Sequence, residues 1–190
     1  MWTRGGRCVW SAMMVAVGDV IVVTGPPGAG KSTVAQRLVD MFDPSALVAG
    51  DKFFGFLRNG AISPWLDVAR EQNNAVNAAA AAATGRLASH CDVVYDGVVR
   101  PLLLRSFLET AELQNLHYAV LLPPLTVCLQ RVHTRRGHGF TDLDVAEHMW
   151  HDFRRADIEA RHVIEDNSEQ PAEIVRSLAQ QIAGGTIRYS

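Results

Sequence analysis

A glycine-rich stretch that ends in a lysine and a serine is the part of this sequence best suited to chemistry. It matches the phosphate-binding pattern G-x-x-x-x-G-K-[ST] and lies between an apolar β-branched run and a helical pattern. Its residues are Gly25, Pro26, Pro27, Gly28, Ala29, Gly30, Lys31, Ser32 and Thr33. Glycines let the backbone curl so that successive N–H groups point at an anion, and the following helix adds its own free N–H groups. Such a stretch binds a nucleoside triphosphate. The alternative is a strand-to-helix turn whose glycines serve geometry alone.

Within this stretch two side chains have distinct roles. Lys31 can reach the outer phosphates, and the Ser32 hydroxyl can complete the shell of a Mg²⁺ ion. Asp96 ends a later apolar run, where its carboxylate can hold a water bound to Mg²⁺, grip a substrate hydroxyl or cap the turn before Gly97. We leave these three roles for Asp96 open.

Other charged side chains follow predicted strands and helices. Asp51 comes directly after a short buried run, at the edge where ligands of open α/β sheets collect, although it also suits the cap of the segment that follows. Arg100 can pair with an anionic substrate or with a surface carboxylate, and we favour the surface pair. His148 and His151 lie three apart on one predicted helix, but no H-E-x-x-H motif accompanies them, which favours a polar helix face over a zinc site.

The pattern of apolar runs predicts the elements that must position these side chains. Short β-branched or apolar runs predict five buried strands, at 20–24, 46–49, 93–95, 118–122 and 162–164. Helical spacing and capping residues predict helices at 31–41, 64–89, 101–113, 125–135, 142–157 and 171–182. Strands that alternate with helices form a parallel sheet covered on both faces, so we expect an α/β fold.

Length and charge narrow the class of protein. The 190 residues suffice for one well-buried core and are few for two, so we expect a single domain over residues 19–190. Residues 1–18 are expected to be an extension, either a disordered tail or sequence before a natural start at Met13 or Met14. The net charge of −2 gives no electrostatic reason to expect nucleic acid as the main partner. Three widely spaced cysteines, Cys8, Cys91 and Cys128, indicate buried thiols in a reducing compartment. We expect a cytoplasmic monomer or homodimer that does not contact a membrane.

The chain resembles P-loop small-molecule kinases of the nucleoside-monophosphate-kinase-like fold, in particular the branch that contains gluconate kinase, shikimate kinase and chloramphenicol phosphotransferase. The resemblance runs from about residue 20 to 182 and is carried by the loop at 25–32, by Asp51 and by the arginine-rich segment 131–136. It implies the strand order 2-3-1-4-5, ATP and Mg²⁺ as cofactors, and transfer of the γ-phosphoryl group to a hydroxyl of a small molecule.

The resemblance also implies roles for individual residues. Asp51 would hold the acceptor hydroxyl and take or orient its proton. The end of one predicted helix, with Arg131, Arg135 and Arg136, and the short turn at 137–141 would form a lid that closes over ATP. Arg131 and Arg135 lie four apart on one helix face, and the arginines would supply guanidinium groups to the migrating phosphoryl. The alternative is that basic residues near a helix end favour the helix dipole.

The acceptor is not fixed by these residues. Aromatic side chains such as Phe54 with amides such as Asn73 suit an uncharged or polyhydroxylated molecule, antibiotic-like or metabolic, although the aromatics could instead be core. The gluconate-kinase pattern of an aspartate followed shortly by a histidine is absent, because Asp51 is followed by Lys52 and Phe53. The alternatives are a nucleotide-binding module that hydrolyses ATP and acts through a protein partner, a sugar-nucleotide kinase, and a polynucleotide 5′-hydroxyl kinase.

Overall fold

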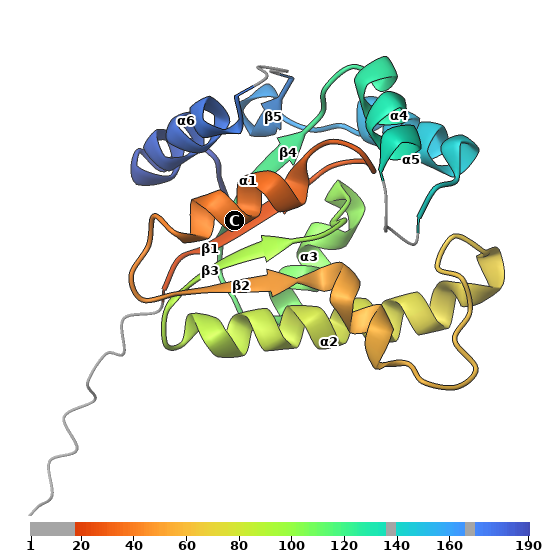
Figure 1. Ribbon diagram of the computed structural model, residues 1–190. Helices are drawn as coiled ribbons and strands as arrows, with labels where there is room; N and C mark the ends of the chain where they lie inside the picture. Colours follow the sequence, from red (N-terminus) through yellow and green to blue (C-terminus); the bar gives the residue numbers. More distant parts are fainter. Residues whose placement is uncertain (1–17, 136–139, 166–169) are drawn as a thin grey trace, which may run out of the picture.

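The computed structural model describes residues 18–135, 140–165 and 170–190 (Figure 1). Within them, five parallel strands form a sheet in the order β2-β3-β1-β4-β5, and β6 pairs antiparallel with β4. The strands are β1 (Val20–Thr24), β2 (Ser45–Ala49), β3 (Asp92–Asp96), β4 (Leu116–Leu121), β5 (Val163–Ile164) and β6 (Arg188–Tyr189). The predicted α/β class and strand order are confirmed. β6 was not predicted, because two residues are too few to show an alternating pattern.

Helices cover both faces of the sheet (Figure 1). The α-helices are α1 (Lys31–Val39), α2 (Arg70–Ala88), α3 (Pro101–Thr110), α4 (Leu125–Thr134), α5 (Leu143–Arg155) and α6 (Pro171–Ala183). Three short 3-10 helices are η1 (Gly50–Phe56), η2 (Asp67–Ala69) and η3 (Ala160–His162). Side chains of α2, α3 and α5 share one core cluster with one face of the sheet, and those of α1, α4 and α6 share a second cluster with the other face.

The central strand divides its apolar side chains between these two cores. Val20 and Val22 belong to the α2–α3 side, whereas Ile21 and Val23 belong to the α1–α6 side. All five residues of β1 are buried, which is the continuous apolar pattern of a parallel strand covered on both faces. This placement fixes the loop that follows Thr24 at the carboxyl edge of the sheet.

The alanine tract of α2 lets this helix pack closely on its neighbours. Ala80, Ala81 and Ala88 are buried against the sheet and α3. Gly85 contributes to the same contact, since a Cβ there would lie 2.6 Å from the carbonyl carbon of Ala111 and would overlap its oxygen. Small residues on this face therefore allow the backbone of α2 to approach the end of α3.

The predicted start of α2 at residue 64 is wrong. The helix begins at Arg70, after a turn at 63–66 and the 3-10 helix η2. Amide side chains in the first turn of α2 hold the preceding segment in a folded-back path: Gln72 Oε1 accepts from the Ile62 N–H at 2.8 Å and Gln72 Nε2 donates to the Ile62 carbonyl at 2.7 Å. Residues 64–69 thus precede the helix, although helical spacing and capping residues predicted a start at residue 64.

Candidate active site

The glycine-rich loop is shaped by contact with the neighbouring strand and helix. Gly25, Gly28 and Gly30 have φ values of 141°, 80° and 95°, a backbone region that favours glycine. A Cβ at Gly25 would overlap the Leu121 carbonyl oxygen at the end of β4. A Cβ at Gly28 would lie 2.9 Å from both the Cα and the carbonyl carbon of Cys128 in α4 and would overlap the carbonyl oxygen. The loop therefore packs against β4 and α4. Gly25 and Gly28 must be glycines both because of their backbone conformation and because there is no space for a Cβ.

Lys31 is folded back over this loop. It is the first residue of α1, is only 9% exposed, and its Nζ donates to the Pro26 carbonyl at 3.1 Å. The Ala29 N–H donates to the same carbonyl at 3.2 Å, which closes the turn that contains Pro27. Burial lowers the pKa of Lys31, and the carboxylates of Asp51 and Asp96 oppose that change. A buried amine of this kind gains from an anionic partner such as a phosphate.

Ser32 and Asp96 come together beside Lys31. Asp96 ends β3, in register with Val23 of β1 and Ala49 of β2. Burial raises the pKa of Asp96, and a hydrogen bond from the Ser32 hydroxyl and the charge of Lys31 oppose the rise. A hydroxyl and a carboxylate at the loop are the oxygen ligands that Mg²⁺ prefers, so the donor set fits this ion. Thr33, the next residue, is exposed in the first turn of α1.

Asp51 lies across the strand ends from Asp96. It is the second residue of η1, is exposed, and its charge acts on Lys31, Asp96 and Tyr95. η1 is capped by Ala49 without a side-chain hydrogen bond, so the alternative role of Asp51 as a cap is not what the structure shows. The carboxylate is left available at the same edge of the sheet as the loop.

The two predicted arginines approach the loop from α4. Arg131 Nη1 donates to the Gly28 carbonyl at 3.4 Å and lies 3.7 Å from the position of a Cβ on Gly30. Arg135 is the exposed residue at the end of α4, and its positive charge reaches both Lys31 and Asp96. Arg136 and residues 137–139 of the predicted lid turn lie outside the described residues, as do residues 1–17 of the predicted extension.

Three candidate substrate contacts are engaged elsewhere or only border the site. Arg100 Nη1 donates to Asp152 Oδ2 of α5 at 3.0 Å, which is the favoured surface pair. Asn73 Nδ2 donates to the Pro64 carbonyl at 2.6 Å, while its Oδ1 is buried without a partner in the described structure. Phe54 is half-buried in η1. Their contact with an acceptor stays a prediction.

Sequence reasoning missed the residue that joins the Asp96 segment to β1. Thr24 Oγ1 accepts from the Val99 N–H at 2.9 Å and donates to the Val99 carbonyl at 3.3 Å. The Tyr118 hydroxyl donates to the same carbonyl at 2.8 Å. The sequence did carry a signal for this contact: Thr24 ends an otherwise aliphatic strand, and a buried hydroxyl needs a hydrogen-bond partner.

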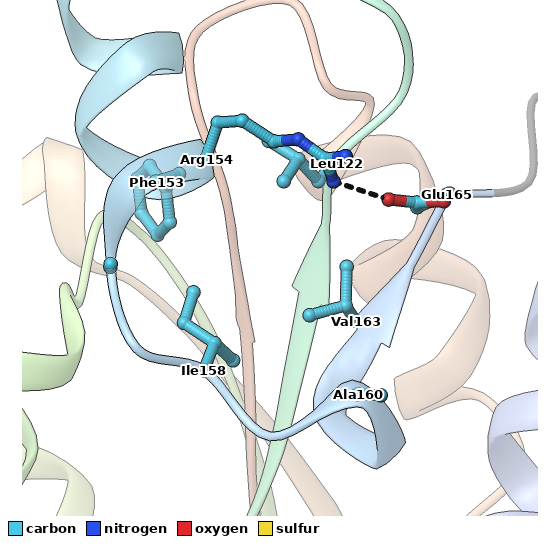
Figure 2. A pocket seen from close by; sticks show the side chains of 8 residues that line it. Leu122, Phe153, Arg154, Ile158, Ala160, Val163 and Glu165 are labelled. Atoms are coloured by element: carbon cyan, nitrogen blue, oxygen red, sulfur yellow. Dashed lines mark hydrogen bonds and ion pairs between the residues drawn. The ribbon is translucent and has the colours of Figure 1, made fainter.

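A hollow elsewhere on the molecule does not belong to this site. It has a volume of about 350 Å³ and lies between the end of α5 and β5. The ion pair between Arg154 Nη1 and Glu165 Oε1, 2.7 Å long, crosses it above Val163 (Figure 2). Lys31, Asp51 and Asp96 are not among the residues that line it. The hollow is therefore separate from the glycine-rich loop and the side chains beside it.

The two histidines and two of the cysteines are engaged in local contacts or in the core. His148 and His151 approach Asp152 and Glu147 of their own helix at 3.8 and 3.7 Å, and no group of three metal-ligating side chains occurs in the described residues. Cys91 and Cys128 are free and buried, and burial raises the pKa of Cys128 to about 11. No helix in the described part of the chain is both long and apolar enough to cross a bilayer.

Comparison with known proteins places this geometry in context. The family described as AAA domain matches residues 20–157. The fold is similar to that of a Deinococcus radiodurans tunicamycin resistance protein, with a TM-score of 0.64, 18% identity, and coverage of 87% of this chain and 95% of that one. A gluconokinase from Sinorhizobium meliloti 1021 has a TM-score of 0.59 and 21% identity, with coverage of 90% and 94%.

A further similar structure is shikimate kinase from Acinetobacter baumannii in complex with shikimate. Its TM-score is 0.58 at 19% identity, with coverage of 90% of this chain and 96% of that one. No curated protein sequence matches the chain significantly. At these identities the structural similarities show a kinase-like P-loop fold.

Proposed function

Because the chain belongs to the AAA-domain family and has a kinase-like P-loop fold, we propose that it is an ATP-dependent kinase that phosphorylates a hydroxyl of a small molecule. The observation that carries this proposal is the convergence of four kinds of group at one edge of the sheet. They are the glycine-rich loop with Lys31, the Ser32–Asp96 pair, the Asp51 carboxylate, and the arginines at the end of α4.

Each group has a role in the proposed transfer. The loop backbone and Lys31 bind the phosphates, Ser32 and Asp96 hold Mg²⁺, and the ion when bound neutralises charge on the phosphate oxygens. The acceptor oxygen attacks the γ-phosphorus while its proton passes to the Asp51 carboxylate, and the bond to the bridging oxygen breaks to release ADP. Arg131 and Arg135 stabilise the negative charge that moves with the phosphoryl group.

Exposed apolar side chains support an acceptor with an uncharged, apolar part. Phe56, Trp65 and Val68 are 72%, 45% and 75% exposed in the segment that follows β2. Phe56 packs on Phe53 with ring centroids 5.2 Å apart, and Trp65 packs on Phe140 at 5.7 Å. The same exposed surface favours the second candidate, a nucleotide-binding module that acts through a protein partner.

A ligand screen followed by a transfer assay separates the two candidates. Thermal shifts with Mg²⁺ and a non-hydrolysable ATP analogue identify hydroxyl compounds that stabilise the ternary complex, since ligands stabilise the folded state according to affinity and concentration. Transfer of a labelled γ-phosphoryl group to such a compound supports the kinase. ATP hydrolysis without any phosphorylated acceptor supports the module.

Lys31→Ala tests the assignment of the loop. We expect turnover to fall by at least about 100-fold, the scale for losing one contact that stabilises the transition state, while the far-UV spectrum is retained. Lys52→Ala is the control, because Lys52 is the only other lysine in the sequence and is exposed. Near-normal transfer by a folded Lys31→Ala protein would contradict the assignment.

A further inference from the structure

Tyr95 is a buried tyrosine that directly precedes Asp96 on β3, the strand between β2 and β1 (Figure 1). It is 3% exposed and belongs to the core on the α2–α3 side of the sheet. Its ring meets Phe107 of α3 edge-on, with centroids 5.0 Å apart and an interplanar angle of 74°. The ring is therefore fixed by the core, and its hydroxyl is directed by that packing.

The hydroxyl end of this ring fills the space beside two glycines. A Cβ at Gly50 would overlap the Tyr95 hydroxyl and lie 2.7 Å from Cζ, and a Cβ at Gly97 would lie 3.0 Å from the hydroxyl and 2.8 Å from Cε1. Neither glycine is among the residues with positive φ, so space and not backbone conformation demands glycine here. Gly50 directly precedes Asp51, and Gly97 directly follows Asp96. One hydroxyl thus separates the two segments that carry the site's carboxylates.

The Tyr95 hydroxyl is a hydrogen-bond donor, because a phenol keeps its proton at neutral pH. Gly50, which it contacts, leads into Asp51, and Gly97, which it also contacts, follows Asp96. Both carboxylates lie close enough for their charges to act on it. The phenol is thus a neutral donor beside the two segments that carry the carboxylates.

We propose that Tyr95 is a positioning residue whose hydroxyl holds the Asp51 and Asp96 segments at a fixed separation and donates to the Asp51 carboxylate during transfer. The inference rests on the proposed function, because it assigns the acceptor side of the same reaction. The donated hydrogen bond orients the carboxylate oxygen that takes the acceptor proton, while Asp96 stays beside Ser32. A tyrosine that only fills the core would need its ring but not its hydroxyl.

Tyr95→Phe keeps the ring and removes the hydroxyl. We measure Mg²⁺-dependent ATP hydrolysis, in which water takes the place of the acceptor, and transfer to any compound found in the screen. We expect kcat to fall about tenfold or more, the scale of one hydrogen bond to a charged group, with the ATP dissociation constant unchanged. Tyr118→Phe is the matched control, because Tyr118 is equally buried on β4 and its hydroxyl donates to the Val99 carbonyl. That variant should lose melting temperature and keep its kcat.

A second readout does not depend on activity. The sequence contains three tyrosines, so protein labelled with ¹³C at the tyrosine Cζ gives three signals that Tyr→Phe variants assign. We expect Asp51→Asn and Asp96→Asn each to shift the Tyr95 signal and to leave the Tyr118 signal in place. An unmoved Tyr95 signal overturns the inference whatever the activity. An active wild type with an unchanged Tyr95→Phe kcat also overturns it. If the variants shift the Tyr95 signal but the wild type shows neither transfer nor hydrolysis, the proposed function is refuted and the positioning role with it. The contact between Tyr95 and the two aspartates would still stand.

Discussion

Gly28→Ala tests how tightly the glycine-rich loop is held against α4. Alanine at a φ of 80° costs about 1–2 kcal/mol of folding free energy, because its Cβ crowds its own backbone. The same Cβ would meet the backbone of Cys128, and forcing an extra methyl group into packed surroundings costs about 1–3 kcal/mol more. We therefore expect Gly28→Ala to lose about 2–5 kcal/mol of unfolding free energy and to bind ATP more weakly.

Two other glycines separate the conformational cost from the cost of contact. Gly60 has a φ of 71° and nothing within 4 Å of its Cβ position, so Gly60→Ala should lose only the conformational part and keep its ATP affinity. Gly30 has a φ of 95°, and the one atom near its Cβ position is the Arg131 Nη1, 3.7 Å away. The loss of unfolding free energy in Gly30→Ala should therefore resemble that in Gly60→Ala. Urea unfolding and ATP titration measure both quantities. Equal stability losses for Gly28→Ala and Gly60→Ala would refute the contact with α4.

Two further predictions concern stability. Burial lowers the pKa of His117 and of His162, so protonation favours the unfolded chain: this stability is present above the ordinary value of about 6.5 and is lost as the pH falls below it. Asp19 opposes the lowering of the His117 pKa and Arg188 adds to it, and Glu159 and Arg161 act in the same two ways on the pKa of His162. Urea unfolding midpoints between pH 7.5 and 5 should therefore fall less in His117→Gln than in the wild type. Thr24→Val leaves the buried Val99 N–H without its acceptor and should cost about 1–3 kcal/mol by urea unfolding; a loss below 0.5 kcal/mol, roughly the low end for one hydrogen bond, would contradict the assigned contact.

Local patterns were sufficient to predict the phosphate-binding loop. The motif names Gly28, Lys31 and Ser32 by spacing, and the apolar run before it can be only a buried strand in that context. The parallel alternation then places Asp51 and Asp96 at the same edge, because Asp96 ends β3, Asp51 follows the end of β2 by two residues, and the carboxyl ends of parallel strands meet there. These residues follow from chain order and strand direction alone.

Contacts between distant segments were beyond sequence reasoning. The Arg100–Asp152 pair joins residues 52 positions apart, and its geometry depends on where α5 lies. The Tyr95 hydroxyl meets Gly50 only because β2 and β3 are neighbours, and an apolar strand pattern assigns that tyrosine simply to the core. The start of α2 was misplaced for a local reason: Gln72 and Asn73 bind the backbone of Ile62 and Pro64, and such side-chain-to-backbone bonds compete with a helical path for the segment before the helix.

The most direct test of the account is Asp51→Asn, which keeps the shape of the side chain and removes its charge and its ability to accept a proton. ATP affinity should hold, because in the proposed mechanism the phosphates are bound by the loop and Lys31 and not by Asp51. Transfer to the acceptor should fall by about 10²–10⁴-fold, the range for a positioned general base. Both quantities are measured on one variant, with Asp67→Asn in η2 as an exposed control. Unchanged transfer with unchanged ATP affinity would contradict the role of Asp51 in catalysis.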